Sequence, residues 1–111
     1  MNQEFINDMK PISTTEMPSI KFDEELKESG GKILAQSGKI GWMHSLSDSP
    51  GAKFDIVIKD SLGRIKYEKR NCHSEVKQFG ELINLPTFIG EELEIKIENV
   101  SGAKKIDLFL N

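Results

Sequence analysis

The sequence predicts an all-β protein, an antiparallel β-sandwich of jelly-roll or immunoglobulin-like topology with an extended N-terminal arm. Two observations support this fold class. Short apolar stretches alternate with turn residues from Gly31 onward, and no segment after Gly31 keeps a helical period for ten residues. The 111 residues suffice for one modest core. We therefore expect an arm over residues 1–19 and a sandwich domain over residues 20–111.

The beginning of the chain differs in charge from the rest. Residues 1–29 hold seven acids and three bases, whereas residues 30–111 hold eleven acids and twelve bases. Pro11, Pro18 and a Ser-Thr-Thr cluster interrupt any sustained period, so this segment cannot form a core alone. Its apolar residues are frequent enough to contact a partner. The candidate partner-contact residues are Phe5, Ile6, Met9, Ile12 and Met17.

Two alternatives stay open for the end of this segment. The segment can be a disordered end whose last residues add an edge strand to the domain. Alternatively, Ser19–Glu28 can form a short helix, with Ser19 as its cap and Gly30 as its stop.

Eight short strands are expected after the arm. The clearest is Glu92–Glu98, because Leu93, Ile95 and Ile97 alternate with charged residues and so face one side of a sheet. Two packed sheets would bury one face of every strand, which predicts a sandwich. The expected strands are Lys32–Gln36, Lys39–His44, Lys53–Lys59, Arg64–Lys69, Glu75–Phe79, Glu81–Leu85, Glu92–Glu98 and Lys104–Leu110.

Two connections have the composition of tight hairpin turns. In Asp60-Ser61-Leu62-Gly63 the aspartate can accept hydrogen bonds from the turn backbone, and the glycine supplies a positive φ. Asn99-Val100-Ser101-Gly102 repeats this arrangement. Longer loops are expected at residues 47–51 and between Pro86 and Gly90.

Residues for enzymatic chemistry are scarce. Cys72 is the only cysteine, which excludes an internal disulfide and is typical of a reducing cytoplasm. Cys72 and His73 are adjacent, so on a strand they would face opposite sides, and we expect them in a loop region between Lys69 and Glu75.

The carboxylates do not suggest a metal site either. Asp48, Asp55 and Asp60 lack the close regular spacing of a calcium loop. We therefore expect no enzymatic activity, no catalytic or metal-binding residue and no cofactor.

Charge and hydropathy restrict the partners. The net charge of −3 argues against a general nucleic-acid binder. No apolar run approaches the roughly eighteen residues that span a bilayer, and Met1–Lys10 does not resemble a secretory signal. We expect neither nucleic acid nor a membrane as a partner.

Aromatic residues leave two interpretations. Trp42 alternates with Ile40 and His44, which favours a position at the packing centre of the core. If Trp42 and Tyr67 instead lie on the surface, they can stack on a sugar ring, as in a carbohydrate- or ligand-binding module.

Opposite charges gather in two parts of the chain. They can pair between neighbouring subunits, or they can belong to an ordinary mixed surface. The basic residues are Lys66, Lys69, Arg70 and Lys77, and the acidic ones are Asp23, Glu24, Glu25 and Glu28.

Over residues 20–111 the layout resembles that of small β-sandwich domains in tailed-bacteriophage virions, particularly head decoration and auxiliary capsid proteins. The segments that carry this resemblance are Gly31-Lys32-Ile33-Leu34, Gly38-Lys39-Ile40-Gly41-Trp42, Asp60-Ser61-Leu62-Gly63, Leu85-Pro86 and Ile95-Lys96-Ile97-Glu98-Asn99. No functional residue of that family can be carried over.

The resemblance implies a structural virion protein, made in the host cytoplasm. Such a protein binds the outside of a viral capsid and stabilises it by bridging capsid subunits through the arm. The implied partner is the major capsid protein or another virion protein, and the implied state is a homo-oligomer or many copies on a shell.

Overall fold

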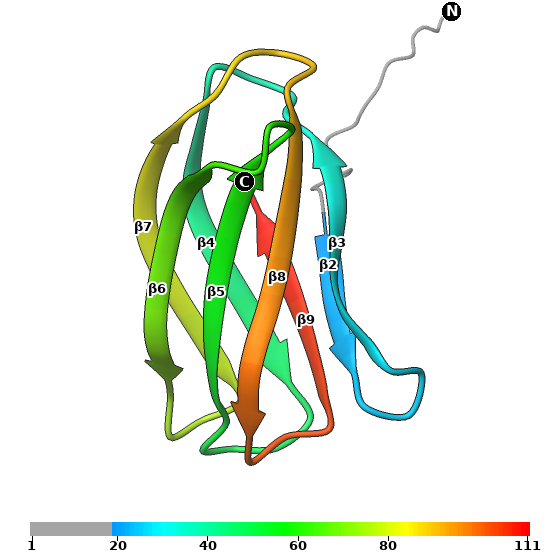
Figure 1. Ribbon diagram of the computed structural model, residues 1–111. Coiled ribbons are helices and arrows are strands. Elements are labelled where there is room, and N and C mark those ends of the chain that lie inside the picture. The colour runs from blue at the N-terminus through cyan, green and yellow to red at the C-terminus, as the bar shows by residue number, and fades with distance from the viewer. Residues whose placement is uncertain (1–18) are drawn as a thin grey trace, which may run out of the picture.

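The fold is all-β and antiparallel, as the sequence predicts (Figure 1). It is known from a computed structural model, which describes residues 19–111. The strands are β2 (Ser19–Asp23), β3 (Glu28–Leu34), β4 (Lys39–Ser47), β5 (Lys53–Asp60), β6 (Ile65–His73), β7 (Gln78–Pro86), β8 (Glu92–Ser101) and β9 (Lys105–Leu110).

One continuous sheet replaces the two separate sheets that we expected. Its strand order is β6-β5-β8-β3-β2-β9-β4-β7, and every neighbouring pair is antiparallel. The sheet curls until its two edge strands, β6 and β7, approach each other (Figure 1). The result is a flattened, nearly closed barrel whose two faces enclose the core.

The beginning of the described chain joins the two halves of this sheet. β2 pairs with β3 on one side and with β9 on the other, so it is an interior strand and not an edge strand. The alternative helix at Ser19–Glu28 is wrong. The Asp23 carboxylate accepts hydrogen bonds from the N–H groups of Glu25 and Leu26, at 3.0 and 3.2 Å, which stabilises a turn at this point.

The core follows the alternation that the sequence predicts. Leu93, Ile95 and Ile97 of β8 are at most 1% exposed. Ile106, Leu108 and Leu110 on β9 are equally buried, because both strands turn every second side chain inward. The other large members of the core are Ile20, Ile33, Ile40, Met43, Phe54, Ile56, Ile58, Cys72 and Leu85.

Side chains close the seam between β6 and β7. Within residues 19–111 no backbone ladder joins these two strands. Instead, the Tyr67 hydroxyl donates to Glu81 at 3.0 Å, and the Lys69 ammonium lies 3.4 Å from the same carboxylate. Tyr67 therefore packs partly against the core with its polar end at the seam.

The two predicted hairpins have different outcomes. β5 and β6 pair on either side of Asp60-Ser61-Leu62-Gly63, so this hairpin is confirmed. The second prediction is wrong, because β8 pairs with β3 and β5 whereas β9 pairs with β2 and β4. The connection after β8 thus crosses from one face of the barrel to the other, with Gly102 at φ 80°.

Gln78 and Phe79 of the predicted strand Glu75–Phe79 are continuous with the predicted strand Glu81–Leu85 in a single strand, β7, whereas Glu75–Lys77 lie in the connection before it. Gly80 lies inside it, opposite His44 of β4. A glycine without a side chain interrupts the hydropathy pattern but not the backbone ladder, which explains the false break.

Trp42 is not in the core, and this prediction is wrong. Its side chain is 52% exposed, whereas Met43 is fully buried. The register between β4 and β7 shifts between Ile40 and Trp42, and the N–H groups of Gly41 and Trp42 both donate to the Asn111 carbonyl, at 2.9 and 3.1 Å. This bulge reverses the alternation, so Met43 takes the inward position.

Candidate partner-binding surface

Three loops gather at one end of the barrel (Figure 1). They connect β3 to β4, β5 to β6, and β7 to β8. We define the loop end as residues 32–39, 59–66 and 86–92. It holds five of the ten exposed large apolar side chains of residues 19–111, namely Leu34, Leu62, Ile65, Phe88 and Ile89.

These apolar side chains are strongly exposed. Phe88 is 65% exposed and Ile89 is 77% exposed. Exposed apolar residues that are scattered singly are ordinary, whereas several on three neighbouring loops at one end of a domain are typical of an interaction surface.

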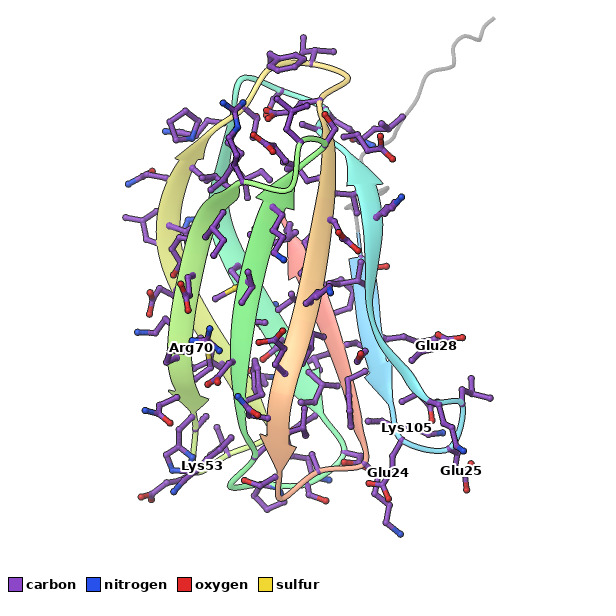
Figure 2. The ribbon with its side chains drawn as sticks, viewed as in Figure 1. Glu24, Glu25, Glu28, Lys53, Arg70 and Lys105 are labelled. Atoms are coloured by element: carbon purple, nitrogen blue, oxygen red, sulfur yellow. The ribbon has the colours of Figure 1, made fainter. Side chains whose placement is uncertain are left out.

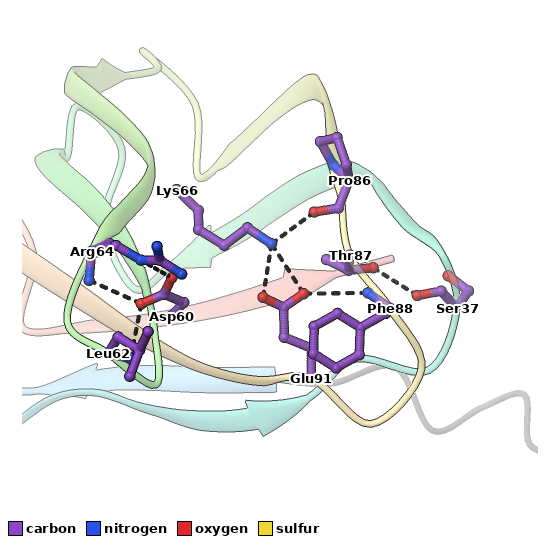
Figure 3. A network of polar contacts seen from close by, with 9 residues as sticks. All are labelled: Ser37, Asp60, Leu62, Arg64, Lys66, Pro86, Thr87, Phe88 and Glu91. Carbon is purple, nitrogen blue, oxygen red and sulfur yellow. Dashed lines mark hydrogen bonds and ion pairs between the residues drawn. The ribbon is translucent and has the colours of Figure 1, made fainter.

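A partly buried ion pair fixes the loop between β7 and β8 (Figure 3). Glu91 is 8% exposed, and the Lys66 ammonium donates to both of its carboxylate oxygens, at 2.8 and 3.0 Å. The same ammonium donates to the Pro86 carbonyl at 2.9 Å, and the Phe88 N–H donates to Glu91 at 3.2 Å. The carboxylate thus holds the backbone of Phe88 in place.

Backbone bonds attach this loop to the neighbouring one. The Ala35 N–H donates to the Glu91 carbonyl and the Gly90 N–H donates to the Ala35 carbonyl, each at 2.8 Å. The Thr87 hydroxyl donates to the Ser37 carbonyl at 2.6 Å (Figure 3). The two loops therefore form one rigid unit beneath Phe88 and Ile89.

Asp60 organises the third loop, as the sequence predicts. Its carboxylate accepts hydrogen bonds from the N–H groups of Leu62 and Arg64 and from the Arg64 guanidinium, each at 2.9 Å. These contacts, above all the Arg64 N–H, lower the pKa of Asp60 although partial burial opposes this. The loop that presents Leu62 is thereby ordered before any partner binds.

A rigid apolar surface suits protein binding. Because hydrogen bonds already hold these loops, a partner that covers Phe88 and Ile89 would lose little free energy to their ordering. Anchors of this kind contribute most of the affinity in protein interfaces.

The charges of the loop end favour an acidic partner. It contains five bases and three acids. Each acid lies in an ion pair, Asp60 with Arg64, Glu91 with Lys66 and Glu92 with Lys32. Within residues 19–111, Lys39 and Lys59 have no carboxylate within 4.0 Å.

The opposite end of the barrel differs in its net charge and in its number of exposed apolar side chains. Residues 23–28, 47–53, 73–78 and 101–105 hold six acids and five bases. Figure 2 shows Glu24, Glu25 and Glu28 around the turn between β2 and β3. Only Leu26 and Val76 are large exposed apolar residues here.

The structure does not bring the two candidate stacking residues together. Trp42 lies on the outer face of β4 opposite Leu82 of β7, which is also 52% exposed. Tyr67 faces inward at the seam, where burial and the Glu81 carboxylate raise the pKa of its phenol to about 12. Trp42 is thus accessible to a ligand, and Tyr67 is not a second platform beside it.

The basic group of β6 is neutralised within the chain. Arg70 pairs with Asp55 at 3.0 Å, with Glu98 at 3.3 Å and with Glu68. Lys66 and Lys69 are also paired, as described above. These contacts leave little positive charge on β6 for the acidic residues of a neighbouring subunit.

Cys72 and His73 lie on β6, not in the loop that we expected. Cys72 is fully buried, and burial raises the pKa of its thiol to about 11. His73 is exposed and its Nδ1 lies 3.2 Å from the Ala52 carbonyl. Across residues 19–111 no group of three or more His, Cys, Asp or Glu side chains could hold a metal ion.

Two shallow hollows flank Gly30 and Gly31, with volumes of about 400 and 410 Å³. Their walls are polar, and the nearest charges partly neutralise each other, since Lys21 lies 3.8 Å from Glu28. They lack the apolar lining of most ligand sites.

Other sequence predictions fall outside the described residues. Phe5, Ile6, Met9, Ile12 and Met17 precede Ser19, so the structure does not test them as partner contacts. Sequence reasoning also missed the loop end. A signal was present in Thr87-Phe88-Ile89-Gly90, where two large apolar residues occupy a short loop that Pro86 and Gly90 delimit.

Comparisons with known proteins add little. No family model matches this chain, and no curated protein matches it. Among solved structures, FlgD from P. aeruginosa aligns with a TM-score of 0.46 and 7% identity, covering 88% of this chain and 77% of that one. Residues 19–111 contain no helix that is long and apolar enough to cross a membrane.

Proposed function

We propose that this chain is a non-catalytic structural protein of a virus particle, an accessory protein on the outside of the capsid. The observation that carries the proposal is the loop end, where hydrogen-bonded loops hold Phe88, Ile89 and Leu62 exposed to solvent. Such a surface suits a lasting protein contact. The viral setting comes from the sequence resemblance to decoration and auxiliary capsid proteins.

Detection in purified particles tests the proposal. Intact virus particles are purified from a culture that produces the chain, and they are labelled with gold-conjugated antibodies against it and imaged by electron microscopy. We expect labels on the outer surface in many copies per particle. Absence of the chain from purified particles, by labelling and by mass spectrometry, would refute the viral function.

A second candidate is a carbohydrate-binding module, favoured by the exposure of Trp42. An accessible indole can stack on a sugar ring. Titration with soluble glycans should then change the fluorescence of Trp42, the only tryptophan of the chain. Unchanged emission across a glycan panel would remove this candidate.

A further inference from the structure

The loop end calls for a partner that is both apolar and acidic. It exposes Phe88 and Ile89, and its Lys39 and Lys59 have no ion-pair partner among residues 19–111. Two copies that met loop end to loop end would bring these lysines together. Like charges across an interface oppose binding, so this symmetric contact is disfavoured.

A segment of the chain itself has the required composition. Residues 1–18 contain Glu4, Asp8 and Glu16 against Lys10, a net charge of −2. Besides Met1, the same segment contains the large apolar residues Phe5, Ile6, Met9, Ile12 and Met17. Its apolar residues can pack against Phe88 and Ile89, and its carboxylates can pair with Lys39 and Lys59.

The segment also enters the fold at the right place. β2 runs antiparallel to β3, and β3 ends at Leu34 in the loop end. β2 therefore begins in the half of the barrel that is nearer to the loop end (Figure 1). Eighteen residues can span at most about 60 Å, roughly twice the length of a ten-residue strand, so they can reach an adjacent copy.

We propose that the loop end of one copy binds residues 1–18 of a neighbouring copy. The inference rests on the proposed function, since it names the partner through which copies on a shell would be linked. Phe88 and Ile89 are the apolar contacts, and Lys39 and Lys59 attract the acidic side chains.

Peptide binding to the full chain provides the test. A fluorescent peptide of residues 1–18 is titrated by anisotropy against full-length chain that carries Phe5→Ser, Ile6→Ser and Met9→Ser, which disables its own segment. We expect saturable binding. Adding Phe88→Ser and Ile89→Ser should weaken it roughly tenfold or more, as the loss of two interface anchors does.

Matched variants distinguish this contact from nonspecific hydrophobic binding. Val76→Ser removes an apolar residue of similar exposure, 63%, at the opposite end and should leave the affinity within about twofold. Lys39→Glu with Lys59→Glu should weaken binding without removing any apolar residue. Circular dichroism melting verifies that each variant is folded.

Two results would overturn the inference. The first is the absence of saturable binding, and the second is equal weakening by the loop-end variant and by Val76→Ser. Either result would leave the detection of the chain on virus particles unaffected, so failure of this inference and failure of the proposed function are distinguishable.

Discussion

Asp55 stabilises the most irregular part of the sheet. The register of β5 shifts beside it, against both β6 and β8. Its carboxylate accepts hydrogen bonds from the Asn99 side chain at 2.7 Å, the Asn71 N–H at 2.8 Å and the Arg70 guanidinium at 3.0 Å. Asn71 and Asn99 both have a positive φ, so one carboxylate holds two residues in an unusual conformation.

This environment predicts a pH dependence of stability. The Asn99 amide, the Asn71 N–H and Arg70 lower the pKa of Asp55 below its ordinary value of 3.8, against the effect of burial. A lowered pKa in the folded state adds stability that is present above pH 3.8 and is lost as the pH falls through the folded-state value. Asp55→Asn should therefore be less stable than the natural chain near neutral pH.

Urea unfolding at several pH values measures this effect. The difference in free energy of unfolding between the two chains should narrow as the pH falls from about 7 to about 2.5. A difference that stays constant over this range would contradict the role of the Asp55 charge.

Gly30 is required for a close approach between β3 and β8. Its φ is 132°, and a Cβ atom there would clash with the Ile95 carbonyl oxygen. Gly63 also has a positive φ, 84°, but a Cβ atom there would meet nothing within 4 Å. We expect Gly63→Ala to lower the free energy of unfolding by about 1–2 kcal/mol, because alanine disfavours this backbone conformation.

Gly30→Ala should lower the free energy of unfolding clearly more than Gly63→Ala, because at Gly30 a clash with an interior strand is added to the cost of a positive φ. Thermal unfolding of the two variants measures the difference. Equal losses of stability would show that β3 can move away from β8 without penalty.

At the scale of the element, the bulge in β4 decides which side chain enters the core. Met43 is fully buried and Trp42 is 52% exposed. Met43→Ala should cost about 2–5 kcal/mol, the usual effect of a large cavity in a core. Trp42→Ala should cost less than about 1 kcal/mol, as an exposed position does.

Urea unfolding of both variants tests this assignment, and acrylamide quenching of Trp42 in the folded chain provides an independent measurement. We expect ready quenching. A protected indole, or a larger loss from Trp42→Ala than from Met43→Ala, would place the tryptophan inside the barrel.

At the scale of the whole molecule, the seam between β6 and β7 depends on polar side chains. Glu81 accepts from Tyr67 and lies beside Lys69. Burial, followed by the Glu81 hydrogen bond and charge, raises the pKa of the phenol from 10.0 to about 12. The stability that this contact adds is therefore fully present below pH 10.0 and is lost as the pH rises toward about 12.

Tyr67 is the only tyrosine, so its titration can be followed by the absorbance of the phenolate. Glu81→Gln should lower the pKa of Tyr67 while leaving it above 10.0, because burial of the ring remains. An unchanged pKa in this variant would mean that the carboxylate does not contact the phenol in solution.

Local patterns predicted much of the fold. The alternation of Leu93, Ile95 and Ile97 identified a strand with one buried face, and the Asp60 turn identified the β5–β6 hairpin. Both depend on residues close in sequence. The candidate site was harder to predict. The loop containing Phe88 and Ile89 and the Asp60 turn were each expected, but local patterns do not show that they lie at the same end of the barrel as the loop between β3 and β4.

The sequence by itself determined the fold class, most strand positions and one hairpin, because side-chain alternation and turn conformation are local properties. Only the tertiary structure decided the pairing of β8 with β3 and β5, the exposure of Trp42 and the gathering of three loops. These depend on contacts between distant residues. Asn111, for example, bonds to Gly41 and Trp42 and fixes the bulge that turns the indole outward.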